Sequence, residues 1–309
     1  MSEEFTYTAS ALGLGGVINV GGKRTVISSR ASVALAPTGG EGHAVESNFS
    51  AEGISFDHAE SHVVGFDNGN HRYTTYSDVL ITGLNIFNRL RIGLMRATVE
   101  SSHDLGSRYS EFRLQAEYRD VSIDGYEIVP ELDIDLKDNC ETYSKITAHL
   151  GSHATRYERQ YGLQSGMLAH ALVQSPPPPL QASLVEKLQV YPVKPMGGRP
   201  PVPGRAYGLT VENFGRAHFA EYQVKPGRRR VTLLRLDLNS MQQLAAEQFQ
   251  TQQLDTEQLE MQQLQTDAMN GGSEPQAAPL FMLNAAGPQY DGTVSVTSLD
   301  GNGSPPWDR

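Results

Sequence analysis

Alternation of apolar and polar residues marks much of the first 130 residues as short β-strands. Between 90 and 99, Leu90, Ile92 and Leu94 are separated by polar or small residues, including Arg91. Because successive side chains of a strand point to opposite faces, this period of two predicts a half-buried strand with the three apolar residues on its inner face. Further runs that favour strands lie at 17–20, 25–27, 32–36, 49–56 and 73–86.

Glycine-containing pairs separate several of these runs. Asp124-Gly125 lies between two alternating segments, which is typical of a type I′ β-hairpin turn. Gly21-Gly22 suits a second tight hairpin, because glycine adopts positive φ without a steric penalty. We interpret Gly53 as a bulge within one strand, since it interrupts an otherwise strand-like run.

The alternation continues beyond the hairpin and returns late in the chain. Leu132, Ile134 and Leu136 alternate with acidic residues, which predicts a strand with one buried side and one acidic, solvent-facing side. In the late run 231–238, the apolar residues do not keep a single period of two. We therefore expect an irregularity at Leu234 within a strand.

Apolar spacing becomes helical between 139 and 173. The expected inward face consists of Cys140, Tyr143, Ile146 and Leu150. Asp138 or Asn139 is the expected N-cap, and Gly151 is expected to end the first helix. The prolines at 176–179 stop the helical stretch, because proline lacks the backbone donor and clashes with the preceding turn.

Residues 242–266 divide into five-residue units: QQLAA, EQFQT, QQLDT, EQLEM and QQLQT. A pentapeptide solenoid needs a small inward residue two positions before each central apolar one, whereas here that residue is Gln or Glu, which is costly to bury unpaired. In a helix, a step of five residues rotates each centre by about 140°, so no apolar stripe forms. We therefore expect a tolerated insertion, with self-association through glutamines as the alternative. The strands that flank it are expected to pair.

These patterns predict a mainly β fold. We expect an antiparallel sandwich or barrel-like unit of short strands with a small helical insertion. The β-rich domain is expected to comprise 1–240 plus 288–303, with the helical insertion at about 139–173. Residues 241–287 form the Gln-rich repeat and linker insertion, and 304–309 form a C-terminal tail.

Composition narrows the classes of partner and compartment. The chain has 309 residues, a hydrophobic fraction of 39% and a formal net charge of −10. Since phosphate neutralisation requires clustered Lys and Arg, we expect no nucleic-acid partner. The sequence contains no window of about 20 apolar residues, so we also expect no membrane insertion. The single cysteine, Cys140, excludes an internal disulfide, and Glu3 and Glu4 stand where a secretory signal is basic. We therefore expect a cytoplasmic protein.

One motif has the residue types of a metal site. His58, Glu60 and His62 occupy alternate positions, so on a strand all three side chains share one face. Two imidazoles and a carboxylate are ligands for zinc or another divalent metal, which is the one cofactor candidate. Three further histidines are candidates to complete the site: His43, His71 and His103. The alternative is a polar strand face in solvent.

Two segments are candidates for binding a partner. Arg228, Arg229 and Arg230 form the basic cluster of the chain, which suits a phosphate or an acidic protein surface, although such charge also blocks edge-to-edge pairing of strands. Trp307 stands beside two prolines in the tail. A tryptophan on a stiff stem suits docking into a pocket, while folding back on its own sheet and fraying are the alternatives.

Several segments resemble an uncharacterised family of bacterial all-β proteins. They are ITGLNIFNRLRIGLMRATVESSHD, YRDVSIDGYEI, DLKDNCETY, ENFGRAHFAEYQV, RRRVTLLRLDL and DGTVSVTSLDGNG. The resemblance runs from about Tyr73 to Gly303, and several members of the family lack the glutamine insertion. It implies a single β-rich unit and a bacterial origin. The family has no assigned function, so the resemblance implies no catalytic residue.

Three classes of function remain. The first is a non-enzymatic structural or assembly protein that forms a homo-oligomer through its β-rich domain. The second is a binding module for a small ligand or a protein partner, using loops at one end of the β unit. The third is a metal-dependent enzyme centred on His58, Glu60 and His62. We rank them in that order, because no nucleophile motif is present and the strands are many.

Overall fold

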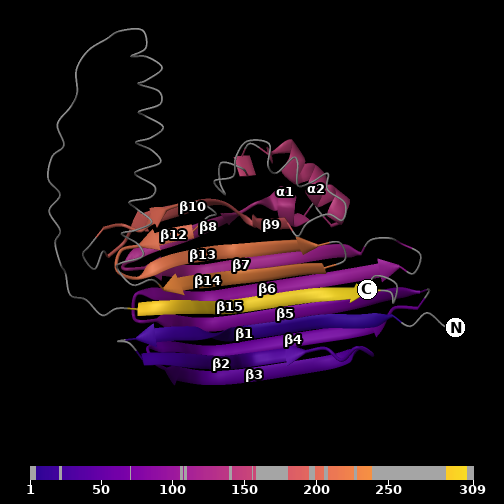
Figure 1. Cartoon of the computed structure of the whole chain (residues 1–309), viewed down its shortest axis with the longest axis horizontal. Helices are drawn as coiled ribbons and strands as arrows, with labels where there is room; N and C mark the ends of the chain where they lie inside the picture. Colours follow the sequence, from indigo (N-terminus) through magenta and orange to yellow (C-terminus); the bar gives the residue numbers. More distant parts are fainter. Residues whose placement is uncertain are drawn as a thin grey trace, which may run out of the picture.

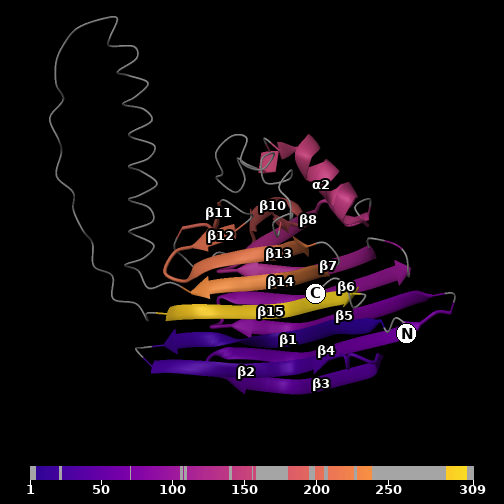
Figure 2. The ribbon, with the colours of Figure 1, turned by 45° about the vertical axis from the view of Figure 1, so that its right-hand side comes forward.

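The computed structural model describes residues 5–20, 23–69, 71–104, 107, 110–138, 141–154, 156–157, 180–194, 199–204, 208–225, 228–238 and 290–304. Over these residues the chain forms two antiparallel sheets that pack face to face (Figure 1). Figure 2 shows the same two layers after a turn of 45°. The predicted mainly β sandwich is thus confirmed.

The front layer in Figure 1, called sheet A, has eight strands in the order β11-β12-β13-β14-β15-β1-β2, with β9 paired to β13. Their bounds are β1 Thr6–Val20, β2 Lys23–Ala34, β9 Leu180–Ser183, β11 Val202–Pro203, β12 Gly208–Val211, β13 Gly215–Lys225, β14 Arg228–Leu238 and β15 Tyr290–Ser304. Strand β15 pairs with both β14 and β1. The predicted pairing of the strands that flank the glutamine insertion is therefore confirmed, while the repeat 242–266 lies outside the described residues.

The back layer, called sheet B, has seven strands in the order β10-β8-β7-β6-β5-β4-β3. Their bounds are β3 Gly40–Ala51, β4 Ile54–Asp67, β5 Arg72–Ile86, β6 Leu90–Asp104, β7 Glu111–Ile123, β8 Tyr126–Leu132 and β10 Val185–Pro192. From β3 to β8, each strand pairs with the next one along the chain. This simple meander agrees with the many short turns expected from the sequence.

Positive φ angles locate the tight turns of the meander. Asp124 and Gly125 have φ of 50° and 80° and connect β7 to β8, so the predicted type I′ turn is confirmed. Glu52 and Gly53 have φ of 50° and 82° and connect β3 to β4. The interpretation of Gly53 as a bulge within one strand is therefore wrong, because two consecutive positive φ values reverse the chain.

The strand expected to run through Leu136 ends earlier. Strand β8 stops at Leu132, and helix α1 follows at Ile134–Asp138. Asp133 is buried, and its carboxylate accepts a hydrogen bond of 2.9 Å from the Leu136 amide. An acidic residue that accepts from the first turn favours a helix start, which explains why the acidic alternation did not continue as a strand.

Helix α2 spans Tyr143–Ser152. Three predicted residues of its inward face are buried: Tyr143, Ile146 and Leu150. Thr142 is the N-cap and accepts from the Lys145 amide at 3.3 Å, so neither of the two expected caps serves it. The helix continues one residue past Gly151, and Cys140 lies outside the described residues. Within the described part of the chain, no helix is long and apolar enough to cross a membrane.

A transverse crease interrupts the regular pairing of sheet A. The ladder skips a pair at the same level on five neighbouring strands. The skipped positions are Ala220, Leu233, Thr297, Gly13 and Ala31. At the crease, Leu233 and Leu234 are adjacent yet both fully buried. The predicted irregularity at Leu234 is therefore confirmed, and two consecutive side chains enter the core.

Sheet B has a crease of the opposite sense. The positions skipped at this level are Asn48, Asp57, Gly83, Gly93 and Asp120, and between β4 and β5 the ladder also skips the neighbouring pair of Phe56 and Leu84. In β6, Leu90 and Ile92 are buried, but beyond the crease Met95 takes the inner face and Leu94 is only half-buried. The placement of Leu94 on the buried face is therefore wrong, because the crease shifts the alternation by one residue.

The two creases face each other across the core. A Cβ added at Gly13 would lie 3.3 Å from the Cβ of Ala59 on β4. Two side chains of sheet B donate hydrogen bonds of 2.6 Å to carbonyls of the sheet A crease: Tyr118 to Leu233, and Ser61 to Ala31. Since a buried carbonyl requires a donor, these bonds satisfy groups that the ladder leaves unpaired.

Candidate functional site

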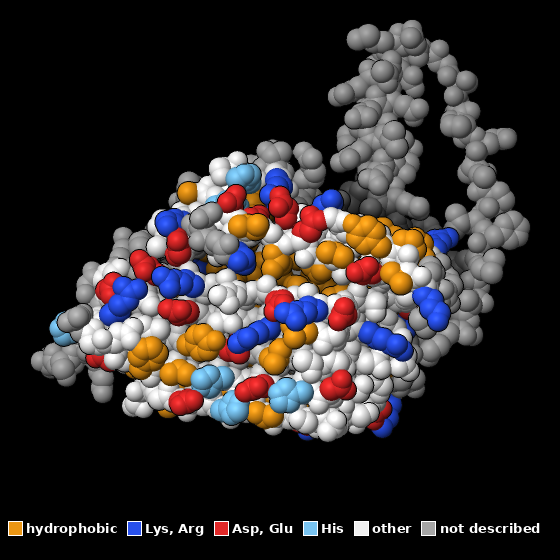
Figure 3. Space-filling model, turned by 180° about the vertical axis from the view of Figure 1, so that it is seen from behind, with side chains coloured by type: hydrophobic (Ala, Val, Ile, Leu, Met, Phe, Trp, Pro, Cys, Tyr) orange, Lys and Arg blue, Asp and Glu red, His pale blue; other side chains and the backbone are white. Residues whose placement is uncertain are grey.

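The predicted His-x-Glu-x-His face exists on β4. His58, Glu60 and His62 are half-buried and alternate with the buried Ala59 and Ser61. They lie on the outer face of sheet B, beside its edge strand β3. Figure 3 shows this face from behind, with histidine and acidic side chains gathered near its lower edge. The period of two therefore predicted the shared face correctly.

The partners of Glu60 differ from those expected. Glu60 Oε1 accepts a hydrogen bond of 2.7 Å from His43 Nε2 on β3, while Oε2 lies 3.5 Å from His58 Nε2. The hydrogen bond from His43 lowers the pKa of Glu60, outweighing the opposing effect of burial. His58 also bonds Ser47 through Nδ1 at 3.1 Å. The carboxylate thus holds two imidazoles from neighbouring strands.

His62 belongs to a separate pair. Its Nε2 lies 2.8 Å from Glu41 Oε1 on β3. Of the other candidate histidines, His71 is exposed at a turn and His103 is buried near Ser110 at 3.2 Å, so neither joins the group. Among the residues that the structure describes, no group of three or more His, Cys, Asp or Glu side chains is arranged to hold a metal ion.

The arginine cluster is divided by burial. Arg229 is only 1% exposed, and its guanidinium lies 4.4 Å from the centre of the Phe112 ring. Arg228 and Arg230 are exposed on the opposite face of β14. Arg229 is therefore part of the core rather than of a basic surface. The other partner-binding candidate, Trp307, lies outside the described residues.

The edges of the two sheets meet along one side of the sandwich. Strands β2 and β3 are the last strands of their sheets and lie next to each other (Figure 1). Side chains connect them without a ladder: Arg30 lies 3.2 Å from Glu46, and Lys23 lies 3.3 Å from Glu52. The edge of sheet A is thus basic where the edge of sheet B is acidic.

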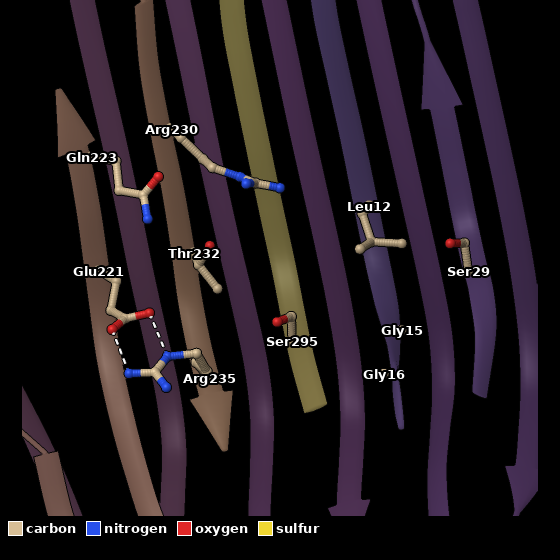
Figure 4. Close-up of a pocket in the computed structure, with 10 residues that line it drawn as sticks. All are labelled: Leu12, Gly15, Gly16, Ser29, Glu221, Gln223, Arg230, Thr232, Arg235 and Ser295. Atoms are coloured by element: carbon tan, nitrogen blue, oxygen red, sulfur yellow. Dashed lines mark hydrogen bonds and ion pairs between the residues drawn. The ribbon is translucent and has the colours of Figure 1, made fainter. Parts of the chain in front are cut away.

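The crease of sheet A opens a furrow on its outer face (Figure 4). Because Leu233 and Leu234 both point inward, the neighbouring outward side chains of β14 are Thr232 and Arg235, one residue further apart than regular alternation allows. The furrow has a volume of about 620 Å³. It is lined by Leu12, Gly15, Gly16, Ser29, Glu221, Gln223, Arg230, Thr232, Arg235 and Ser295.

A fixed ion-pair chain forms one wall of the furrow. Arg235 donates two hydrogen bonds to Glu221, of 2.8 and 2.9 Å, and also pairs with Asp237. The hydrogen bonds to Glu221 raise the pKa of Arg235 above its ordinary value. Asp237 in turn lies 3.3 Å from His218, which is 6% exposed. Such bidentate, charge-assisted bonds hold the wall in one geometry.

Sequence reasoning missed the furrow. Its residues come from five strands whose neighbours are set by the crease and by the late return of β15. The available signal was the doubled apolar pair at Leu233 and Leu234, which indicates that outward side chains are spaced further apart there. That signal indicates wider spacing of the outward side chains on β14, but it does not show which other strands line the furrow.

The family described as Domain of unknown function (DUF8256) matches residues 5–175. This range includes β1 to β8 and both helices, so it contains all the strands of sheet B except β10. Neither the curated proteins nor the solved structures include a match to the chain. By this match the chain belongs to the DUF8256 family, an uncharacterised domain family.

Proposed function

We propose that the protein is a non-enzymatic assembly protein that self-associates by pairing the edges of β2 and β3 with those of a second copy. The observation that carries this proposal is the meeting of two 12-residue edge strands on one side of the sandwich. Within the described residues, neither has a ladder partner on its outer side. The unpaired N–H and C=O groups of such a strand are a template for another chain.

The irregular residues of the two edges do not act as edge-specific protection. Ala31 on β2 and Asn48 on β3 have φ of 43° and 57°, and such distortions often block pairing at an edge. Here both belong to creases that cross the interior strands as well. The distortion therefore follows the bend of each whole sheet and is not confined to the edge strands.

Charge favours one arrangement of the two copies. Arg30 is level with Glu46 and Lys23 is level with Glu52, so β2 and β3 run in opposite directions with basic residues beside acidic ones. A twofold axis parallel to the strands relates the two copies without moving any residue along the strand direction. Strand β2 of one copy then forms an antiparallel ladder with β3 of the other, with the same charges opposed, and the interface is closed.

Two proline variants test the proposed ladder. Neighbouring N–H groups of an antiparallel strand point to opposite sides, so only one of Ala44→Pro and Val45→Pro disrupts the ladder from β3 to β4. The variant that keeps the wild-type unfolding temperature lacks only an outward N–H and is expected to be monomeric by light scattering. A wild-type chain that is monomeric at every concentration, or a folded proline variant that still dimerises, contradicts the proposal.

A charged substitution provides a matched control. Val45 on β3 is 50% exposed and Val202 on the opposite edge is 57% exposed. Lysine at an edge opposes pairing, so Val45→Lys is expected to weaken the dimer by about tenfold or more. Val202→Lys is expected to leave it unchanged. Equal effects of the two variants would show that β3 is not the contact.

We also infer a cytoplasmic location and a bacterial source. The single Cys140 in a chain of 309 residues supports a reducing compartment. The bacterial source is supported by the resemblance stated above. Fractionation of the native cells tests the location, and recovery in an exported fraction contradicts it.

A further inference from the structure

We propose that the furrow on the outer face of sheet A binds a ligand through an oxyanion group, a carboxylate or a phosphate, which Arg230 holds. The furrow lies on the outer face of sheet A rather than on the β2–β3 edge: β13, β14 and β15 supply six of its ten lining residues, and Ser29 alone of the ten comes from β2. This binding site therefore stands apart from the proposed self-association.

The two arginines of the furrow differ in their partners. Arg235 is held by both oxygens of Glu221 and by Asp237. Arg230 is exposed, and no carboxylate of the described side chains pairs with it. Figure 4 shows its side chain extending from β14 across β15 into the furrow. One guanidinium is therefore structural, and the other is available to a ligand.

Charge in the furrow is opposite in sign to the whole chain. The lining residues include two arginines and one glutamate, a sum of +1, while the chain carries −10. Since the Glu221–Arg235 pair is neutral, the excess positive charge resides on Arg230. A guanidinium presents a planar fork of donors that matches carboxylate and phosphate oxygens, which identifies the class of ligand.

Small residues leave room beside Arg230. Gly15, Gly16, Ser29 and Ser295 line the furrow on the side of β1, β15 and β2. A Cβ at Gly15 would lie 3.7 Å from its nearest neighbours, the side chain of Leu12 and the Cα of Ser29, which is ordinary contact. Packing therefore does not require glycine there, and its absence of a side chain keeps the furrow open. The serine hydroxyls supply further donors to an oxyanion.

Nuclear magnetic resonance titration of the full chain tests the proposal. Inorganic phosphate and succinate are added separately, in chloride buffer, and amide shifts are followed. We expect at least one of the two anions to shift the amides of Gly15 and Gly16, and the anion that does so identifies the oxyanion. Arg230→Gln is expected to weaken this binding by about tenfold or more. Arg228→Gln, on the same face of the same strand, is the control and is expected to bind as wild type.

A second variant fills the furrow without removing charge. Gly15→Val places methyl groups in the open space and is expected to abolish binding with little effect on the unfolding temperature. Gly204→Val is its control, because a Cβ at Gly204 also meets only ordinary contacts, the nearest at 3.5 Å. The proposal is overturned if neither anion shifts amides of the furrow, or if Arg230→Gln binds as tightly as wild type.

Discussion

The two sheets crease along facing lines, but the crease of sheet A opens a furrow on its outer face, whereas side chains cover the crease glycines of sheet B. In sheet A two consecutive side chains turn inward, and the outer positions around them include the small residues Gly15, Ser295 and Thr232. In sheet B, carboxylates lie over the crease glycines. A Cβ at Gly83 would lie 2.0 Å from Asp57 Oδ2, and a Cβ at Gly93 would lie 2.8 Å from Asp120 Oδ2.

The difference shows that a break in pairing does not by itself make a surface site. Both creases shift the alternation by one residue, but the direction of the doubled side chains differs. Where the two side chains turn inward, they fill the core and leave a hollow on the outer surface. Where they turn outward, the surface is filled and the core receives the side chains of the opposite sheet. The two creases are therefore complementary parts of one packing solution.

The largest effect is expected from Gly83→Ala in sheet B. Gly83 has φ of 64°, and its Cβ would collide with the Asp57 side chain. A left-handed conformation costs an L-residue about 1–2 kcal/mol, and the carboxylate must also move. We expect a loss of about 2 kcal/mol or more in the free energy of unfolding, measured with urea. In an Asp57→Ala background the loss is expected to be smaller, and an equal loss would show that the collision contributes nothing.

The hydrogen bond between the creases gives the next effect. Tyr118→Phe removes the donor to the buried Leu233 carbonyl. Burial raises the pKa of the Tyr118 hydroxyl, which therefore stays a neutral donor. Because the acceptor is left without a partner, we expect a loss of about 1–2 kcal/mol in urea unfolding. Tyr191, which is 46% exposed, provides the control. If Tyr191→Phe costs as much, the creases are not joined by this bond.

The pH dependence of stability distinguishes the carboxylate of Asp237 on sheet A from that of Glu60 on sheet B. Burial works to raise the pKa of Asp237, but the hydrogen bond from His218 and the charge of Arg235 outweigh it and lower the pKa. A lowered folded-state pKa stabilises the fold above the unfolded value of about 3.9, and this stability is lost as pH falls through the folded value.

Asp237→Asn is therefore expected to reduce stability at neutral pH and to flatten its decline below about pH 4. Unfolding with urea at a series of pH values measures this. Glu60→Gln in sheet B is expected to change the slope less, since exposed pairs contribute little. If the free energy of unfolding has the same pH dependence in wild type and Asp237→Asn, the pKa of Asp237 is not lowered in the folded state.

The smallest effect is expected from Gly15→Ala in the furrow. Its Cβ meets only ordinary contacts at 3.7 Å, in contrast to the collision at Gly83. We expect the free energy of unfolding to stay within about 0.5 kcal/mol of wild type. A loss as large as that of Gly83→Ala would remove the distinction between an open and a filled crease.

Local patterns predicted the features that depend on neighbouring residues. The alternation placed His58 and His62 on one face, and the Asp124-Gly125 pair formed the expected turn. Both follow from backbone geometry within a few residues. The contact between His43 and Glu60 could also have been predicted. A hairpin turn at Glu52 and Gly53 sets Val45 opposite Glu60, so that His43, two residues before Val45, is a diagonal neighbour of Glu60 on the same face. Interpreting Gly53 as a bulge concealed that register.

The creases could not be predicted in the same way. Leu94 and Met95 are both apolar, so their order along β6 does not show which one enters the core. The choice depends on the opposite sheet, where Leu233 and Leu234 together occupy the space. Burial of Arg229 beneath Phe112 has the same origin, since a contact between β14 and β7 is not visible in either segment alone.

Self-association through the edges of β2 and β3 is best tested by hydrogen exchange of the wild-type chain at low and high protein concentration. If the two edges pair, outward-facing amides within Lys23–Ala34 and Gly40–Ala51 exchange more slowly at high concentration. Amides of β11, on the opposite edge, are expected to be unaffected. Exchange that is independent of concentration, or protection that appears at β11 instead, would show that β2 and β3 do not form the contact.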